Sequence, residues 1–171
     1  MKILKVKKLR DDAIIPQKAH LTDSGFDLFT VEDIILWPGD TMLAKTGIAI
    51  ELEPGYEAQV RSKSGLALKS GIVVLNSPGT VDCGYKNEVG VILHNTNKAG
   101  SDKVFKAKAG TKIAQMVIQK VELPEIIEVD EIYPEGTERD MGGFGSTGLN
   151  ADKWKCKRGV VSCLNLEKLI K

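Results

Sequence analysis

The sequence predicts an all-β domain, either a sandwich or a barrel, from two observations. Over residues 42–52 one parity carries apolar or small side chains, the period-two pattern of a half-buried strand. The residues on that parity are Met42, Ala44, Thr46, Ile48, Ile50 and Leu52. Further short apolar segments lie at 58–60, 72–75, 89–93, 112–118 and 126–132, with turn signals such as Pro54-Gly55 between them. Many short strands joined by turns are typical of a sandwich or barrel.

One short helix is expected inside this pattern. Ser64 is a good N-cap for residues 65–69, and Gly71 stands where a helix commonly ends. Arg61 and Lys63 flank the helix start, where free N–H groups favour an anion. An ordinary capped surface helix with solvated lysines remains the alternative.

Composition sets broad limits. The chain has 171 residues, enough for one domain with a real core. Its 24 basic and 23 acidic residues leave a net charge of +1, so no nucleic-acid partner is expected. No apolar run has the length of a membrane span, and residues 1–6 alternate like a strand and lack a signal peptide's features. Three scattered cysteines, Cys83, Cys156 and Cys163, suit free thiols in a reducing cytoplasm.

A glycine-rich stretch over residues 139–148 is the most distinctive local feature. Its glycines permit backbone N–H groups to turn toward an anion, and Ser146 and Thr147 add hydroxyl donors. A flexible linker would explain the glycines but requires neither Arg139 nor Phe144. We therefore predict a flap that closes over phosphate groups.

The segment from Leu75 to Tyr85 combines a tight turn with an alternating strand. The amide of Asn76 offers both a donor and an acceptor, which suits a nucleobase edge. Tyr85 presents a flat face for a sugar or base, and Asp82 is a candidate general base. Each residue alone also has a structural explanation: Asn76 in a turn, Tyr85 in the core and Asp82 as a solvated charge.

Taken together, these features resemble the trimeric dUTP diphosphatase (dUTPase) family. All five of its motifs occur in order, and the similarity extends over roughly residues 19–148. They are Asp23-Ser24-Gly25-Phe26-Asp27-Leu28, Arg61-Ser62-Lys63-Ser64-Gly65-Leu66-Ala67, Gly79-Thr80-Val81-Asp82-Cys83-Gly84-Tyr85, Gly110-Thr111-Lys112-Ile113-Ala114-Gln115-Met116 and the glycine-rich stretch at 139–148.

The resemblance implies a jelly-roll-like β-barrel assembled as a homotrimer, with each active site built from all three subunits. It implies hydrolysis of dUTP to dUMP and pyrophosphate with Mg²⁺. Such an activity limits uracil incorporation into DNA and supplies dUMP for dTMP synthesis. The expected location is the cytoplasm, with no membrane or nucleic-acid partner.

The resemblance also assigns roles to individual residues. Asp82 would activate the attacking water, with Arg139 and Gln115 as further catalytic groups. Asp27 would hold Mg²⁺ through water. The implied substrate-binding residues are Lys63, Ser64, Gly65, Asn76, Gly79, Tyr85, Phe144, Gly145, Ser146 and Thr147. Among these, Asn76 and the hairpin backbone would read uracil, and Tyr85 would exclude a 2′-hydroxyl.

Three departures from the family pattern stand out. Ser62-Lys63 replaces the usual Pro-Arg, so the phosphate contact loses a bidentate fork. Asn87 stands where glycine is usual, and asparagine tolerates a positive φ better than most residues. The chain also continues for 23 residues past the flap. We therefore predict a domain over 1–148, including the flap, and a basic extension over 149–171 that docks on the protein.

Two alternatives remain open at this stage. A dCTP deaminase shares the fold, but it needs a glutamate to handle water at the base and a different phosphate motif. A nucleotide-binding regulatory protein would keep the pocket and act through partner contacts made by the basic extension.

Overall fold

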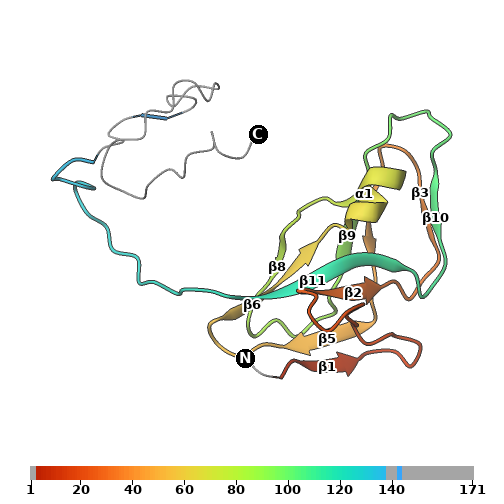
Figure 1. The fold of residues 1–171 in the computed structure, drawn as a ribbon, viewed down its shortest axis with the longest axis horizontal. Helices are drawn as coiled ribbons and strands as arrows, with labels where there is room; N and C mark the ends of the chain where they lie inside the picture. Colours follow the sequence, from red (N-terminus) through yellow and green to blue (C-terminus); the bar gives the residue numbers. More distant parts are fainter. Residues whose placement is uncertain (1–2, 138–141, 144–171) are drawn as a thin grey trace, which may run out of the picture. The chain divides into compact units, whose positions relative to one another are not determined.

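The computed structural model describes residues 3–137 and 142–143. The chain divides into two compact units, Met1–Pro124 and Glu125–Lys171. The first unit contains eleven strands and one helix among the described residues (Figure 1). The elements are β1 Lys5–Lys8, β2 Gly25–Phe29, β3 Ile34–Leu36, β4 Thr41–Ala44, β5 Ile48–Glu51, β6 Tyr56–Arg61, α1 Ser64–Ser70, β7 Ile72–Val74, β8 Gly79–Val81, β9 Val91–Asn95, β10 Phe105–Ala107 and β11 Lys112–Lys120.

The strands form four antiparallel groups. The largest sheet has the order β2-β11-β6-β8, and a second sheet has the order β4-β9-β7. Two further pairs are β1 with β5 and β3 with β10. Long β11 lies at the centre of the first sheet and runs between β2 and β6 (Figure 1). The predicted all-β fold with one short helix is confirmed.

The core draws side chains from all four groups. Its largest fully buried apolar members are Leu28, Ile34, Ile48, Ile72, Leu93, Ile113, Met116, Val89 and Val91. Alternating inward residues on antiparallel strands produce this apolar interior. Among the candidate site residues described below, Asp27 and Gln115 therefore sit on strands whose opposite faces are fixed by packing.

The strand predicted over residues 42–52 is two strands, β4 and β5. The predicted parity is correct, because Ala44, Thr46, Ile48 and Ile50 are all buried. The break falls at Gly47, which has a φ of 68°. A Cβ there would lie 2.8 Å from Ala13 Cβ and from a methyl group of Val31. A left-handed glycine in close contact with two other segments ends the strand.

The predicted helix start is wrong by one residue. Lys63, with φ −88° and ψ 124°, is the N-cap, and Ser64 is already the first residue of α1. The Lys63 carbonyl accepts the N–H of Ala67 at 3.0 Å, which closes the first turn. No side chain caps this end, whereas Gly71 ends the helix in the left-handed conformation as predicted.

The strand predicted over residues 126–132 is also wrong. In the described part of the second unit, residues 125–137 and 142–143, no strand occurs. The segment does carry apolar side chains, but nothing covers them within that part of the chain. Ile126 is 93% exposed and Ile132 is 76% exposed. An apolar segment without a pairing partner does not make a sheet.

The described part of the chain contains no helix that could span a membrane. The only α-helix there, α1, has seven residues, and none of the described helices has the length and apolar character needed to span a bilayer.

Candidate active site

The loop after β8 carries the first group of predicted site residues. We call the hollow beside it the hairpin hollow, with a volume of about 350 Å³. It is lined by Leu43, Val60, Asn76, Gly79, Thr80, Val81, Asp82, Tyr85, Glu88, Val89, Gly90 and Ile92. Four predicted residues from one short segment therefore share a single hollow with mixed polar and apolar walls. Such a lining suits a flat ring with a polar edge.

Backbone bonds determine the shape of this loop. The N–H of Tyr85 donates to the Asp82 carbonyl at 3.2 Å, and the Tyr85 hydroxyl donates to the Glu88 carbonyl at 3.2 Å. The N–H of Val89 then donates to Ile48 of β5 at 2.8 Å. Tyr85 is held at its backbone and at its hydroxyl, while 44% of the residue stays exposed.

Close packing at Gly79 positions the Asn76 amide. A Cβ at Gly79 would lie 2.8 Å from Asn76 Nδ2, so the amide rests directly against the glycine backbone. Gly79 also pairs with Val60 of β6, which holds the strand in register. Asparagine and glycine are therefore required together at the mouth of the hairpin hollow. Asn87 is not left-handed, because Tyr133 is the sole non-glycine residue with a positive φ in the described ranges.

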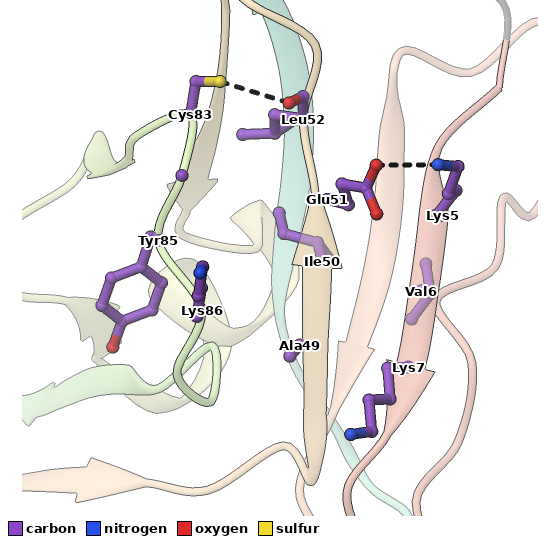
Figure 2. A pocket seen from close by; sticks show the side chains of 11 residues that line it. Lys5, Val6, Lys7, Ala49, Ile50, Glu51, Leu52, Cys83, Tyr85 and Lys86 are labelled. Atoms are coloured by element: carbon purple, nitrogen blue, oxygen red, sulfur yellow. Dashed lines mark hydrogen bonds and ion pairs between the residues drawn. The ribbon is translucent and has the colours of Figure 1, made fainter.

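The back of the same loop is tied to β5. Cys83 Sγ donates to the Leu52 carbonyl at 3.2 Å, as Figure 2 shows. A separate pocket of about 430 Å³ lies here, between β1, β5 and residues 83–86 (Figure 2). The thiol therefore anchors the segment next to Asp82 instead of facing the hairpin hollow.

A second group of predicted residues lies on the first sheet. We call the hollow there the strand-face hollow, with a volume of about 320 Å³. It is lined by Ala19, Asp23, Ser24, Gly25, Asp27, Arg61, Lys63, Gln115 and Val117. No residue lines both this hollow and the hairpin hollow. Within one chain, Asp82 thus lines the hairpin hollow, whereas the predicted phosphate-binding residues Lys63 and Gln115 line the strand-face hollow.

Strand register aligns the strand-face residues. On β11, Gln115 stands opposite Asp27 of β2 on one side and Arg61 of β6 on the other. Directly opposed residues share one face of a sheet. Gln115 Nε2 donates to the Ser62 carbonyl at 2.9 Å, and its Oε1 would lie 2.5 Å from a Cβ at Gly25. The strand order therefore assembles three polar side chains that are far apart in the sequence.

Ser62, one of the departures from the family pattern, joins the two regions. Its hydroxyl accepts the N–H of Val74 at 2.8 Å. Its own N–H, which proline lacks, donates to the Ser77 hydroxyl at 3.3 Å. This link between the end of β6 and the turn before β8 was not predicted from the sequence.

Asp27 is the most buried charged residue of the site, at 7% exposure. Its Oδ1 accepts a hydrogen bond from Lys63 Nζ, and its Oδ2 lies 2.7 Å from Lys112 Nζ. Burial alone would raise the pKa of Asp27, but the hydrogen bonds from Lys112 and Lys63 outweigh it and hold the pKa below its usual value. Asp27 is therefore ionised at neutral pH, with both oxygens engaged by cations.

The predicted metal role of Asp27 is restricted by these contacts. Among the described residues, no group of three or more histidine, cysteine or acidic side chains is arranged to hold a metal ion. The two carboxylates that line this hollow, Asp23 and Asp27, are too few to supply a cage of oxygen ligands. The residues fit only a magnesium ion whose ligands come mainly from the substrate's phosphates, with Asp27 accepting from bound water.

Of the remaining predicted site residues, the structure describes those at the start of α1 but not those of the flap. Ser64 and Gly65 are exposed at the start of α1, and a Cβ at Gly65 would meet no atom within 4 Å. The backbone there is open to approach. The flap residues of the prediction lie outside the described residues, namely Arg139, Phe144, Gly145, Ser146 and Thr147, as does the extension over 149–171.

Comparison with known proteins decides the family. A sequence model described as dUTPase matches residues 11–148. The chain belongs to the dUTPase family. The chain is 54% identical over 149 residues to the deoxyuridine 5′-triphosphate nucleotidohydrolase of Gloeothece citriformis, covering 87% of this chain and 99% of that protein. It is 52% identical to the enzyme of the same name from Clostridioides difficile, covering 85% of this chain and 98% of the relative.

Solved dUTPase structures agree with the fold. The dUTPase of Staphylococcus bacteriophage 80alpha bound to dUPNHPP superposes with a TM-score of 0.81 at 28% identity, covering 87% of this chain and all of that one. A dUTPase mutant from phage phi11 of S. aureus, described with a structural Mg(II) ion, gives a TM-score of 0.72 at 28% identity, covering 77% of this chain and 99% of the other. The dUTPase resemblance recognised in the five motifs is thereby confirmed.

Proposed function

We propose that this dUTPase-family chain is a hydrolase that converts dUTP to dUMP and pyrophosphate. One observation carries the proposal beyond family membership: Asn76, Gly79, Asp82 and Tyr85 line one hollow of about 350 Å³. A nucleobase-sized hollow with a carboxylate at its rim is the arrangement that hydrolysis next to a bound nucleoside requires.

In the proposed reaction Asp82 accepts a proton from a water molecule. The water oxygen attacks the α-phosphorus, and the bond from that phosphorus to the α,β-bridging oxygen breaks. Pyrophosphate leaves with the electron pair of that bond. Asp82 is exposed at the loop and is therefore accessible to water from the hollow. A positioned carboxylate in this role contributes about 10²–10⁴-fold to the rate.

The hairpin residues select the base and the sugar in this proposal. The Asn76 amide and the neighbouring backbone bind the uracil edge, where the amide is held against Gly79. The ring of Tyr85, fixed through its hydroxyl to the Glu88 carbonyl, packs under the deoxyribose. A rigid ring at that place disfavours a 2′-hydroxyl, because a hydroxyl pressed on an apolar face loses its hydrogen bonds.

The strand-face hollow and the start of α1 bind the phosphates in this proposal. Lys63, Ser64, Gly65 and Gln115 supply an ammonium group, a hydroxyl, an open backbone and an amide. These donors stabilise the negative charge that moves onto the leaving pyrophosphate. Arg139 and Phe144 of the flap are proposed to close over the γ-phosphate and the base, with contacts from Gly145, Ser146 and Thr147.

Magnesium is the proposed cofactor, and Asp27 is the residue that would hold it through water. When bound, the ion would neutralise phosphate charge and orient the triphosphate. The supporting observation is the deprotonated, nearly buried carboxylate at the edge of the strand-face hollow.

We further propose a homotrimer with composite sites, working in the cytoplasm. The separation of Asp82 from the strand-face hollow within one chain supports a site completed by a neighbouring subunit. The exposed apolar side chains of residues 126–133 supply surface that assembly would cover. The free, exposed thiol of Cys83 suits a reducing compartment.

Pyrophosphate release from dUTP, dCTP, dTTP and UTP tests the proposed function. The wild-type protein with Mg²⁺ is expected to release pyrophosphate from dUTP far faster than from the other three nucleotides. Asp82→Asn serves as the inactive control. Equal rates with dCTP or UTP would contradict the proposed role of the hairpin, and ammonia release from dCTP would indicate a deaminase instead.

A further inference from the structure

The carboxylate of Asp27 is shared by two lysines from different segments of the chain. Lys63 is the N-cap residue of α1 and its side chain is 27% exposed, whereas Lys112 begins β11 and its side chain is 49% exposed. Their common partner is only 10% exposed at its side chain. Two cations on one carboxylate leave a local excess of one positive charge.

A β-bulge in β11 makes this sharing possible. Lys112 pairs with Phe29 and Gln115 pairs with Asp27, so three steps along β11 match two steps along β2. In a regular strand, Lys112 and Gln115 would point to opposite faces. The register shift between Lys112 and Ala114 brings both to the face that carries Asp27. The Lys112 ammonium also lies 5.9 Å from the centre of the Phe29 ring.

This geometry has a consequence for Lys63. The lysine must contact phosphate to serve in binding, yet its ammonium group already contacts Asp27. If Lys63 turned away with no other cation present, a nearly buried carboxylate would be left unpaired, which is costly. With Lys112 in place, Asp27 keeps one partner when Lys63 turns toward the substrate.

We propose that Lys112 is a positioning residue for phosphate binding, which acts by holding Asp27 so that Lys63 is free to bind the triphosphate. Lys112 acts through Asp27 and Lys63 and does not itself bind the substrate. This inference rests on the proposed phosphate role of Lys63. It assigns a role to the fourth motif beyond that of Gln115.

Calorimetric titration with a non-hydrolysable dUTP analogue in magnesium buffer tests the inference. Lys112→Met is expected to weaken binding of the analogue about tenfold. Residues of one ion-pair network are coupled, and such coupling changes an equilibrium constant by a few-fold up to about a hundredfold. Lys112→Arg restores the cation and should bind within about threefold of wild type. Lys108→Met is the matched control, since Lys108 also pairs with an aspartate, Asp33 at 2.5 Å, but away from both hollows.

The decisive comparison adds Lys112→Met to Lys63→Met. If Lys112 acts through Lys63, the double variant binds no more weakly than Lys63→Met alone. A further tenfold loss in the double variant, or an unchanged affinity of Lys112→Met in a protein with wild-type circular dichroism, would overturn the inference. Wild-type affinity in Lys63→Met would overturn the phosphate role of Lys63 and this inference with it. Absence of analogue binding by the wild-type protein would overturn the proposed function itself.

Discussion

The hairpin hollow and the strand-face hollow are built in different ways. Asn76, Gly79, Asp82 and Tyr85 lie within ten consecutive residues, and local backbone bonds fix most of their geometry. Asp27, Lys63 and Gln115 come from three separate segments, and only the pairing of β2, β11 and β6 brings them together. A change in the hairpin should therefore act locally, whereas a change on the sheet should spread through the ion pairs.

The largest effect is expected from Asp82→Asn in the hairpin. The variant keeps the size of the side chain but removes the proton acceptor, so kcat should fall about 10²–10⁴-fold. Affinity for a non-hydrolysable dUTP analogue should stay close to wild type. Single-turnover hydrolysis and calorimetry measure the two quantities. A kcat near the wild-type value would remove Asp82 from the chemistry.

Subunit mixing tests whether the two hollows serve one site from different chains. Asp82→Asn disables the hairpin and Lys63→Met disables the strand face, so each homotrimer alone should be weak. Mixed trimers should regain activity, because some sites combine an intact hairpin with an intact strand face. Activity is measured after exchange has been verified by mass spectrometry of the assemblies. No gain in exchanged trimers would mean that both groups act within one chain.

Gly79→Ala should raise the KM for dUTP about tenfold. The added methyl group would lie 2.8 Å from Asn76 Nδ2 and displace the amide, and overpacking of this kind costs about 1–3 kcal/mol. Gly65→Ala supplies the contrast, since its methyl group meets open space and should leave thermal stability unchanged or slightly raised. Steady-state kinetics and thermal melts measure both. An unchanged KM in Gly79→Ala would show that Asn76 does not read the base.

The pH dependence of stability should reveal the strand-face ion pairs. The pKa of Asp27 is lowered in the folded chain, so its contribution is fully present above the unfolded value of about 3.9 and is lost as pH falls through the folded value. The Tm of wild type should therefore exceed that of Asp27→Asn at pH 6, and the gap should narrow toward pH 3. Asp33→Asn, which removes an exposed pair with Lys108, should show a smaller gap. A gap that widens on acidification would contradict the ion pairing at Asp27.

The smallest effect is expected from Cys83→Ala. The substitution removes a weak hydrogen bond to the Leu52 carbonyl and should lower the free energy of unfolding by about 0.5–1 kcal/mol. Cys83→Ser keeps a donor and should lose less. Chemical denaturation measures the difference. A loss several times larger would mean that the anchor of the Asp82 loop affects more of the fold than this one bond.

Prediction from the sequence succeeded where the pattern was local. Apolar alternation placed β6, β7, β9 and β11 close to their observed bounds, and Gly71 ended α1 as expected. Strands β2, β3 and β10 were not predicted, because none of the expected apolar segments covers them. The strand predicted over 126–132 is wrong because pairing depends on a partner that an apolar segment alone cannot reveal.

For the site, the sequence by itself determined which residues we propose as candidates. The hairpin residues Asn76, Asp82 and Tyr85 are candidates by their side-chain chemistry, and the family resemblance adds Asp27, Lys63 and Gln115. Only the tertiary structure decided that these form two hollows, that Asp27 is engaged by two lysines and that Lys112 is one of them. The physical reason is register: strict alternation would turn Lys112 away from Gln115, and a single bulge, set by how β11 packs between its neighbours, turns it back.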